Sequence, residues 1–281
     1  MTTTTALETL GRDQVVEVLA YLAQDPIETV FLRGLILRAG LDLGRQHGRF
    51  MAYRDSSGEL GGVILVSSLV VPFATAPEAP LAMAEVLRRS PYPMRNLVGR
   101  RETVEALWAA TGGWRPQPRL VRTSQPVYTV ERDTLQYFPA PELRSARLGD
   151  LDLLVQAGAA MMIEEVEEDP LQTRADQYRS FVRDRILRGE EFVWVDAEGL
   201  RFKCNVSSVT PEAAQIEGVF TPRARRRAGY AKHGLSETCH RLLNGVPALT
   251  LYVNDFNRPA IHLYEQLGFR RSGEYQSIFF S

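Results

Sequence analysis

The spacing of hydrophobic residues predicts alternating helices and strands over the first half of the chain. Apolar residues recur at helical intervals in "RDQVVEVLAYLAQD" (12–25) and "ETVFLRGLILRAGL" (28–41). Two β-rich runs follow, "RFMAYRD" (49–55) and "GGVILVSSLVV" (61–71), and the polar "SSGEL" between them reads as a hairpin turn. The remaining pattern predicts a helix, a strand, a helix and a strand, over 81–90, 95–99, 102–111 and 118–132.

A second group of elements begins after "ERDTLQYFPAPEL" (131–143), which has two prolines and little periodicity. We therefore expect two domains, residues 1–135 and 136–281. The second half begins with a short strand, and Asp150 is a candidate N-cap for the helix that follows. Its pattern continues with a second helix, three strands, a helix, a strand, a helix and a final strand. Both halves place helices before most of their strands, which indicates an α/β protein and hints at an ancient duplication.

The composition is that of a globular protein with little general affinity for polyanions. Of 281 residues, 44% are hydrophobic and 24% are charged, and the formal net charge is −1. A charge near zero argues against binding to nucleic acid or to a membrane surface, so any phosphate site must be local. No apolar run is long enough to span a bilayer, and the first residues lack the pattern of a signal peptide. We therefore expect a cytoplasmic protein.

Cysteine and histidine positions predict neither a disulfide framework nor a metal site. Cys204 and Cys239 lie in segments that read as a buried strand and a buried helix, which is typical of inert core thiols. The four histidines are scattered without the spacing of metal ligands, at His47, His233, His240 and His262. No metal is expected.

The stretch "TPRARRRAGYAKHGL" (221–235) contains four arginines within five positions and ends in an amphipathic pattern. We expect the chain to leave a strand, turn at Pro222 and enter a helix near Arg227. A helix N-terminus presents unpaired N–H groups and a partial positive charge, which together bind phosphate. The small residues Gly229 and Ala231 would let a phosphate group come close to the backbone. A solvated charge run is the alternative, whereas a nucleic-acid patch would need interleaved aromatic residues that this stretch lacks.

Two motifs in the second half resemble the GCN5-related N-acetyltransferase (GNAT) superfamily. "RRAGYA" (226–231) meets the superfamily's coenzyme A signature, Gln/Arg-x-x-Gly-x-Gly/Ala. "LYVNDFNRPAIHLYEQLGFRRSGEY" (251–275) resembles its closing strand–helix–strand segment, with matching residues at Asn257, Ala260, Tyr264, Gly268 and Phe269. The resemblance covers roughly residues 142–281. It implies a bacterial acyltransferase that moves the acetyl group of acetyl-CoA to a primary amine by direct attack in a ternary complex.

The resemblance also implies which residues hold acetyl-CoA. Main-chain groups of Val219, Phe220 and Thr221 would bind the pantetheine arm, and an N–H among them would polarise the acetyl carbonyl. The pyrophosphate would lie on the signature, whose residues are Arg226, Arg227, Ala228, Gly229, Tyr230 and Ala231. Asn257 matches a superfamily asparagine near the pantetheine or pyrophosphate. Helix N-capping is its alternative role, and both roles can hold together.

Proton transfer and amine binding are implied for four other residues. Tyr264 matches the tyrosine that protonates the departing thiolate, a role open to a phenol that stays protonated at neutral pH; packing on the sheet is the alternative. Glu217, inside "QIEGVF", is a candidate general base or a satisfied structural carboxylate. Glu164 and Glu165 begin the acidic run "EEVEED". This run would hold the cationic acceptor, a small-molecule or peptide amine, unless it is a solvated loop.

The first half has a similar order of elements but lacks the coenzyme signature. Where a coenzyme loop would fall it has "VGRRETVEALW" (98–108). It resembles the degenerate N-terminal domains that precede some bacterial acetyltransferases. We therefore expect two tandem GNAT-like domains, each a mixed, mostly antiparallel sheet flanked by helices, of which only the second binds acetyl-CoA. The first would shape the acceptor cleft, form a homodimer or hold a regulatory ligand. Transfer of another acyl group from CoA and a non-catalytic acetyl-CoA sensor are the alternative functions.

Overall fold

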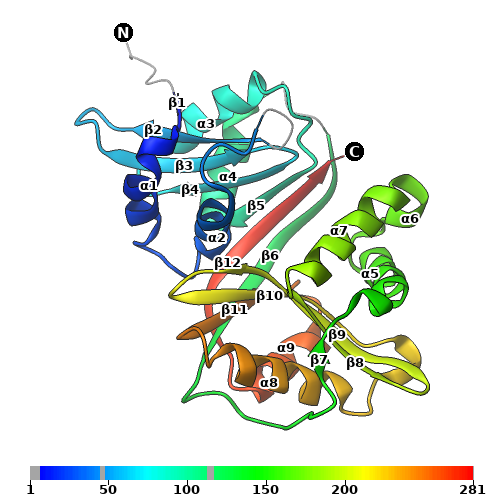
Figure 1. Cartoon of the computed structure of the whole chain (residues 1–281). Coiled ribbons are helices and arrows are strands. Elements are labelled where there is room, and N and C mark those ends of the chain that lie inside the picture. Colours follow the sequence, from blue (N-terminus) through cyan, green and yellow to red (C-terminus); the bar gives the residue numbers. More distant parts are fainter. Residues whose placement is uncertain (1–6, 45–47, 113–116, 281) are drawn as a thin grey trace. The chain divides into compact units, whose positions relative to one another are not determined.

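The chain folds into two compact units, each a β-sheet covered by helices (Figure 1). The computed structural model describes residues 7–44, 48–112 and 117–280. Unit 1 consists of the chain up to Val127 together with Tyr252–Phe256 and the residues from Ser272 onward. Unit 2 consists of Tyr128–Leu251 and Asn257–Arg271. Two C-terminal segments therefore complete the N-terminal unit, an exchange that the sequence pattern does not indicate.

Unit 1 has antiparallel neighbouring strands except for the parallel pair β4–β5. In order across the sheet, the strands are β1 (Glu8–Thr9), β2 (Arg49–Arg54), β3 (Leu60–Val66), β4 (Leu69–Ala74), β5 (Asn96–Arg100) and β12 (Arg270–Phe280). The 3-10 turn η1 (Arg12–Gln14) leads into α1 (Val15–Leu22). Helices α1 and α2 (Val30–Ala39) pack on one face, and α3 (Ala79–Arg88) and α4 (Arg101–Ala110) pack on the other.

The run expected as one strand over 61–71 is instead the hairpin of β3 and β4. Ser67 lies at the turn, where its hydroxyl donates to the carbonyl of Leu69 at 2.6 Å and accepts from the N–H of the same residue at 3.0 Å. A serine that bonds the backbone two residues further on offers the chain an alternative to the straight strand. Hydrophobic residues continue on both sides of this turn, which is why their pattern alone predicts one strand.

Unit 2 has antiparallel neighbouring strands except for the parallel pair β10–β11. Its strands in order are β7 (Arg144–Ser145), β8 (Glu191–Asp196), β9 (Gly199–Val209), β10 (Ala213–Phe220) and β11 (Ala248–Tyr252), while β6 (Pro118–Glu131) begins in unit 1 and ends in unit 2. Helices α5 (Leu151–Val166) and α7 (Ala175–Leu187) pack on one face, joined through the short α6 (Pro170–Thr173). On the other face, α8 (Tyr230–Leu242) lies so close to β9 that any side chain at Gly234 would overlap the ring of Phe202. Helix α9 (Arg258–Gln266) precedes β12.

Asp150 occupies the N-cap position of α5 as expected, but it does not cap the helix with its side chain. Its carboxylate accepts the backbone N–H of Arg147 at 2.7 Å and pairs with the Arg144 guanidinium at 2.7 and 2.9 Å. The 3-10 turn η3 (Leu148–Asp150) precedes α5 and directs the carboxylate back toward β7. The hydrogen bond from Arg144 lowers the pKa of Asp150, so the ion pair fastens the start of α5 to this strand.

Candidate functional site

The candidate site begins where β10 and β11 separate. These parallel strands pair at three positions, Ala213 with Ala248, Ala214 with Leu249 and Gln215 with Thr250. The next residues, Ile216 and Leu251, are not paired, and β10 continues beside β9 alone. A strand that loses its neighbour exposes main-chain N–H and C=O groups along one edge, which an extended ligand can bind.

The register of β10 is irregular where it passes this gap. Its pairing with β9 shifts between Glu217, opposite Asn205, and Phe220, opposite Lys203. Gly218 lies within the shift and has φ +61, a backbone conformation that favours glycine. A side chain there would overlap Oδ1 of Asn205 and lie 3.4 Å from Nζ of Lys203. A β-bulge re-aims the backbone groups of its residues, and such bulges are common beside active sites.

The chain then enters the helix that carries the glycine signature. The helix expected near Arg227 begins at Tyr230, because Arg227 itself adopts φ +65, outside the helical region. Gly229 is the N-cap with φ +83, and no neighbouring atom lies closer than 3.6 Å to the position of a Cβ. The first helical hydrogen bond runs from the N–H of His233 to the carbonyl of Gly229 at 3.1 Å, so the N–H groups of 230–232 have no acceptor within the helix. This helix start has the geometry of a phosphate site.

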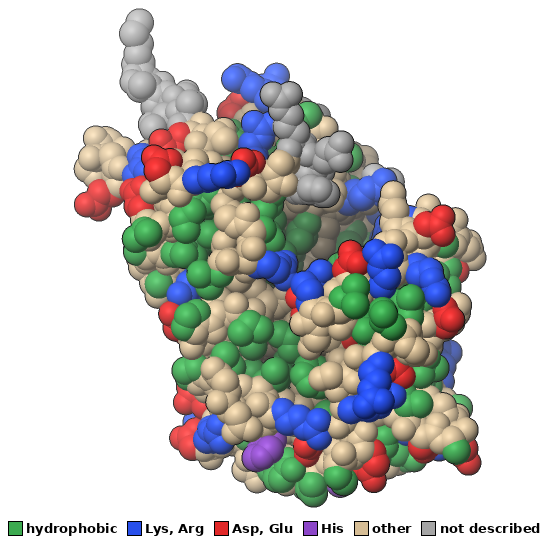
Figure 2. All heavy atoms as spheres, viewed as in Figure 1, with side chains coloured by type: hydrophobic (Ala, Val, Ile, Leu, Met, Phe, Trp, Pro, Cys, Tyr) green, Lys and Arg blue, Asp and Glu red, His purple; other side chains and the backbone are tan. Residues whose placement is uncertain are grey.

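Most of the arginines before this helix are paired with carboxylates. Arg223 and Arg226 both bind Glu164 of α5, at 2.9 and 2.7 Å. Arg225 binds a carboxylate of the β8–β9 hairpin at 2.9 Å. Arg227 is exposed and has no carboxylate partner in the described part of the chain. Figure 2 shows Lys and Arg side chains interspersed with Asp and Glu side chains over the face in view.

The sequence suggests that Glu164 binds the acceptor amine, but in the structure its carboxylate is paired with two arginines. Partial burial raises the pKa of Glu164, but the hydrogen bonds from Arg226 and Arg223 outweigh this effect, so the pKa is lowered overall. A cationic acceptor would have to displace two guanidinium groups to reach this carboxylate. Glu164 holds the arginine segment against α5, and amine binding by Glu164 or Glu165 stays a prediction.

Tyr264 lies on α9 with 6% of its surface exposed. Its ring centroid is 6.3 Å from that of Tyr128 and 5.8 Å from that of Phe269, so the ring packs as the alternative reading expects. Within the described residues its hydroxyl makes no hydrogen bond. Burial raises the pKa of Tyr264, and the nearby carboxylate of Glu165 raises it further. The phenol is therefore protonated at neutral pH, a condition that the proton-donor role requires.

Glu217 and Asn257 each accept one hydrogen bond through a side-chain oxygen. The side-chain amide of Gln215 donates to Oε1 of Glu217 at 2.7 Å, and the other carboxylate oxygen has no hydrogen-bond partner in the described part of the chain. Oδ1 of Asn257 accepts the N–H of Ala260 at 3.3 Å, so this residue caps α9. The capping role is thus confirmed, and the amide nitrogen of Asn257 is left for another partner.

A buried polar cluster behind the bulge was not indicated by the sequence motifs. Lys203 and Arg185 approach the carboxylate of Glu191 to 3.5 and 3.3 Å. Asn205 is 3% exposed, and its Nδ2 has no hydrogen-bond partner in the described residues. Burial, with the charge of Glu191, raises the pKa of Tyr178 on α7 to about 12. The sequence feature that could have indicated this cluster is Lys203, one of only two lysines, which lies between Phe202 and Cys204 in a strand.

Neither the histidines nor the cysteines of the described ranges form a metal site. No group of three or more His, Cys, Asp and Glu residues is placed there to hold an ion. Nδ1 of His233 lies 2.9 Å from the carbonyl of Pro139, and the His240 ring stacks on a tyrosine, while His47 lies outside the described residues. Both cysteines are free and buried, and burial raises the pKa of Cys204 to about 12. No described helix is both long and apolar enough to cross a membrane.

Unit 1 has the same succession of a parallel strand pair and a helix, with α3 in the place of α8. The counterpart of the coenzyme loop therefore precedes α3 rather than lying at 98–108, where the sequence pattern placed it, and the strand pair beside it stays closed. β4 and β5 pair at two positions, Leu69 with Asn96 and Val70 with Leu97. Beyond them the carbonyl oxygen of Pro72 lies 3.2 Å from the position of a Cβ on Gly99, so the two backbones remain in contact. Helix α3 then starts with Glu78 as its N-cap and Pro80 in its first turn. A negative charge and a missing N–H both disfavour phosphate at this helix start.

Two family models match different stretches of the chain. Residues 162–269 match the family model described as the acetyltransferase (GNAT) family. Residues 48–154 match a model described as a domain of unknown function, DUF4081. None of the curated proteins matches the chain.

Solved structures of similar length share the fold. An acetyltransferase of the GNAT family from Colwellia psychrerythraea is 12% identical, aligns over 98% of this chain and 99% of its own, and has a TM-score of 0.61. A protein from Drosophila is 13% identical over 99% of both chains, with a TM-score of 0.68. A tandem GNAT protein from the clavulanic acid biosynthesis pathway is 14% identical over 97% of both chains, with a TM-score of 0.57. At these identities the likeness shows the fold, and it confirms the expected tandem α/β architecture.

Proposed function

Since residues 162–269 form a domain of the acetyltransferase (GNAT) family, we propose that this protein transfers an acetyl group from acetyl-CoA to a primary amine. The observation that carries the proposal is the separation of β10 from β11 directly before the glycine-capped start of α8. An extended thioester arm fits a strand edge with unpaired main-chain groups, and its diphosphate fits the open N–H groups of a helix start. In unit 1 the corresponding strands stay together and the helix start is acidic.

The donor would be held mainly by backbone groups of unit 2. Main-chain groups of 219–221 would bind the arm, and the N–H groups of 228–231 would bind the diphosphate. The ring of Tyr230 packs edge-on against Trp194 at 5.2 Å, so this residue contributes its N–H rather than its side chain. Arg227 is the signature arginine left for a phosphate, because Arg226 is engaged by Glu164. When bound, acetyl-CoA supplies an activated thioester.

The chain's own residues then handle two protons. As the amine attacks, a C–N bond forms and the C–S bond breaks. Glu217 would take the amine proton on its unpartnered oxygen, and Tyr264 would give its phenolic proton to the departing sulfur. A main-chain N–H at the Gly218 bulge would polarise the acetyl carbonyl. The charge of Glu165, which acts on Tyr264, would attract the acceptor while it is still an ammonium ion.

The test combines binding with turnover. Calorimetry of the full chain with coenzyme A should give one site per chain, and a stoichiometry of two would contradict the closed site in unit 1. Thiol release from acetyl-CoA should then be measured over polyamines, amino acids, aminoglycosides and peptides with free N-termini, with the product identified by mass spectrometry. Tight binding without turnover on any amine would favour a sensor instead. Faster release from succinyl-CoA or propionyl-CoA would keep the acyltransferase and change the acyl group.

Two arginine variants offer a matched comparison for the diphosphate site. Arg227→Ala should weaken coenzyme A binding roughly three- to tenfold, since a charge-assisted hydrogen bond is lost at a solvated position. Arg225→Ala should have a smaller effect, because this arginine is already paired with Glu198. If Arg225→Ala proves the more harmful change, the ligand does not approach Arg227.

A further inference from the structure

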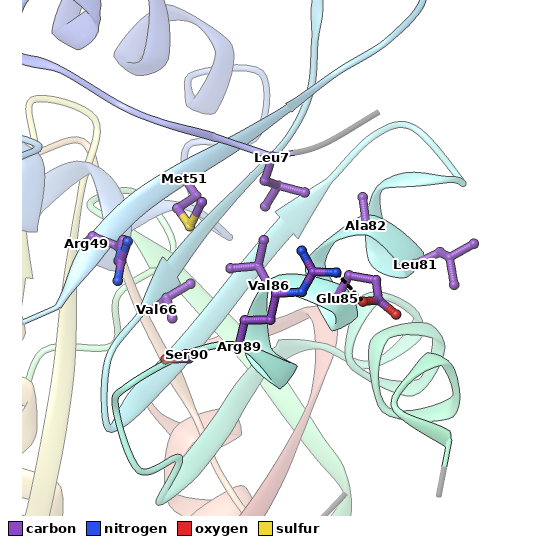
Figure 3. A pocket seen from close by; sticks show the side chains of 10 residues that line it. All are labelled: Leu7, Arg49, Met51, Val66, Leu81, Ala82, Glu85, Val86, Arg89 and Ser90. Carbon is purple, nitrogen blue, oxygen red and sulfur yellow. Dashed lines mark ion pairs between the residues drawn. The ribbon is translucent and has the colours of Figure 1, made fainter. Parts of the chain in front are cut away.

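Unit 1 contains a pocket of about 570 Å³ between its sheet and the C-terminal half of α3 (Figure 3). This volume falls within the range of small-molecule sites. Arg49 and Met51 line it from β2, Val66 from β3, and Val86 and Arg89 from the end of α3. None of these residues belongs to the candidate acetyl-CoA site.

The pocket follows from the way α3 lies on the strands. At one end, Gly62 has no side chain, and Ala79 and Met83 come so close that a Cβ there would lie 2.8 and 2.7 Å from them. Further along the same strands Arg49 pairs with Val66, which places both side chains on the α3 face. Here the helix no longer fills the space above the sheet. The tight contact at Gly62 and the open pocket are therefore two ends of one helix–sheet interface.

The floor of the pocket is hydrophobic core. Leu7, Met51, Val66 and Ala82 line it and are at most 9% exposed. They belong to the cluster that packs α3 and α4 on the sheet, so this surface is preformed. From Leu81 to Arg89 the helix rises roughly 12 Å at about 1.5 Å per residue, a length suited to a medium-chain hydrocarbon.

The charged groups of the pocket stand at its margins. In Figure 3 Arg49 lies at one side, and the Glu85–Arg89 pair lies across the apolar residues from it. Arg49 is partly buried, and its guanidinium carbon lies 5.8 Å from the ring centroid of Tyr92. Within the described ranges Arg49 has no carboxylate partner and makes no side-chain hydrogen bond. A partly buried guanidinium without a counter-ion has its full set of N–H donors available for an anion.

The other margin does not neutralise this charge. Glu85 is shared between Arg88 and Arg89, each at 3.8 Å. Arg88 does not line the pocket, so the charged residues of its lining are Arg49, Glu85 and Arg89, and its rim is positive overall. An apolar floor with a cationic rim selects a ligand that has both an anionic head and a hydrocarbon tail.

We propose that unit 1 binds a medium-chain monocarboxylate in this pocket. The carboxylate pairs with the Arg49 guanidinium in a bidentate contact, and the alkyl chain lies along Met51, Val66 and Val86. A polyphosphate would leave the apolar floor unused and would find few unpaired cations, whereas a neutral alkane would leave Arg49 without a partner. This ligand site is independent of acetyl transfer in unit 2.

Titration of the full-length protein with decanoate, in the presence of saturating coenzyme A, tests the proposal by calorimetry. Coenzyme A is added to occupy the strand gap proposed as the donor site of unit 2, so the remaining heat reports on other sites. Saturable binding of one decanoate per chain is expected, weakening about threefold to fourfold for each methylene removed. Arg49→Gln should weaken decanoate binding at least tenfold and leave 1-decanol binding unchanged. The control Arg88→Gln changes a more distant arginine of the same helix end and should bind as the native protein does.

A second variant, Val86→Trp, fills the pocket and should abolish binding of both decanoate and 1-decanol while the melting temperature stays near its native value. The proposal is overturned by an absence of saturable decanoate binding to the native protein. It is equally overturned if Arg49→Gln binds decanoate as tightly as Arg88→Gln, or if the filled pocket still binds.

Discussion

Replacing Gly218 by alanine tests whether the bulge in β10 places the N–H that acts on the acetyl carbonyl. At φ +61 a residue with a Cβ costs about 1–2 kcal/mol relative to glycine. The new methyl group would also overlap Oδ1 of Asn205, which is 3% exposed and cannot simply turn into solvent. Overpacking of this kind costs about 1–3 kcal/mol, so the folded state should lose roughly 2–5 kcal/mol in total.

The catalytic effect should exceed what lower stability explains. If the bulge straightens to relieve the overlap, its N–H groups move away from the carbonyl, and kcat should fall roughly 10²–10³-fold as for a lost oxyanion donor. The KM for acetyl-CoA should rise much less than kcat falls, since a straightened bulge shifts the main-chain groups of 219–221 but leaves the start of α8 untouched. Thiol release, measured below the melting temperature of the variant, gives both constants.

Gly189→Ala is the matched control for this substitution. Gly189 has φ +72 in the turn after α7, and nothing lies within 4 Å of its Cβ position. It should show the backbone cost alone, with an unchanged kcat. Adding Asn205→Ala to Gly218→Ala removes the overlap and should restore much of the lost stability and kcat. A Gly218→Ala enzyme that is destabilised but retains native kcat would refute the role given to the bulge.

Three further predictions concern the start of α8, Tyr264 and the buried carboxylate of Glu28 in unit 1, which lies beside Arg100. Gly229→Glu should abolish coenzyme A binding in calorimetry, because nothing fills the space at this position and the proposed diphosphate site begins there. At φ +83 the new side chain should also cost about 1–2 kcal/mol of stability, as at Gly189; retained binding would contradict the helix-start site. Tyr264→Phe should lower kcat roughly 10²–10⁴-fold, as for a lost general acid, while acetyl-CoA affinity and stability stay nearly constant; native kcat would leave the ring with packing alone. Burial outweighs the attraction of Arg100 and raises the pKa of Glu28 from its usual 4.5 to about 8. As pH rises, Glu28 therefore loses its proton in the unfolded chain before it does so in the folded protein. The free energy of unfolding should consequently fall between about pH 4.5 and 8. Urea unfolding should show this decline in the native protein and a flatter profile in Glu28→Gln; parallel profiles would contradict it.

Most helices and strands can be predicted from the sequence because each is specified by the hydrophobic spacing of its own residues. The order of helices and strands follows from hydrophobic spacing, and the signature around Gly229 marks a helix start that does offer open N–H groups. The same patterns do not show that β3 and β4 are separate strands. That turn depends on one serine hydroxyl and the backbone beside it, in a stretch where hydrophobicity is continuous.

The site is harder to predict because its side chains find partners far away in sequence. The arginine run suggests several cations ready for phosphate, yet Arg223 and Arg226 are held by Glu164, about 60 positions earlier. Nothing within either segment encodes that pairing. The register shift at Gly218 likewise depends on Asn205 and Lys203 of the neighbouring strand. Sequence motifs therefore identify the backbone parts of this site more reliably than its charged side chains.

The two units differ in only a few residues around the proposed donor site. Both place a helix after a strand that has a parallel neighbour, and both carry helices on the two faces of the sheet. In unit 2 the strands part after Gln215, and the helix begins at a glycine. In unit 1 Gly99 lets the backbone of β5 lie against Pro72, so a glycine closes the gap where an extended arm would enter. Glu78 at the start of α3 then repels the phosphate that Gly229 would admit. Restoring donor binding to unit 1 would therefore require both an opened strand pair and a neutral helix start, and changing either one alone should leave one coenzyme site per chain.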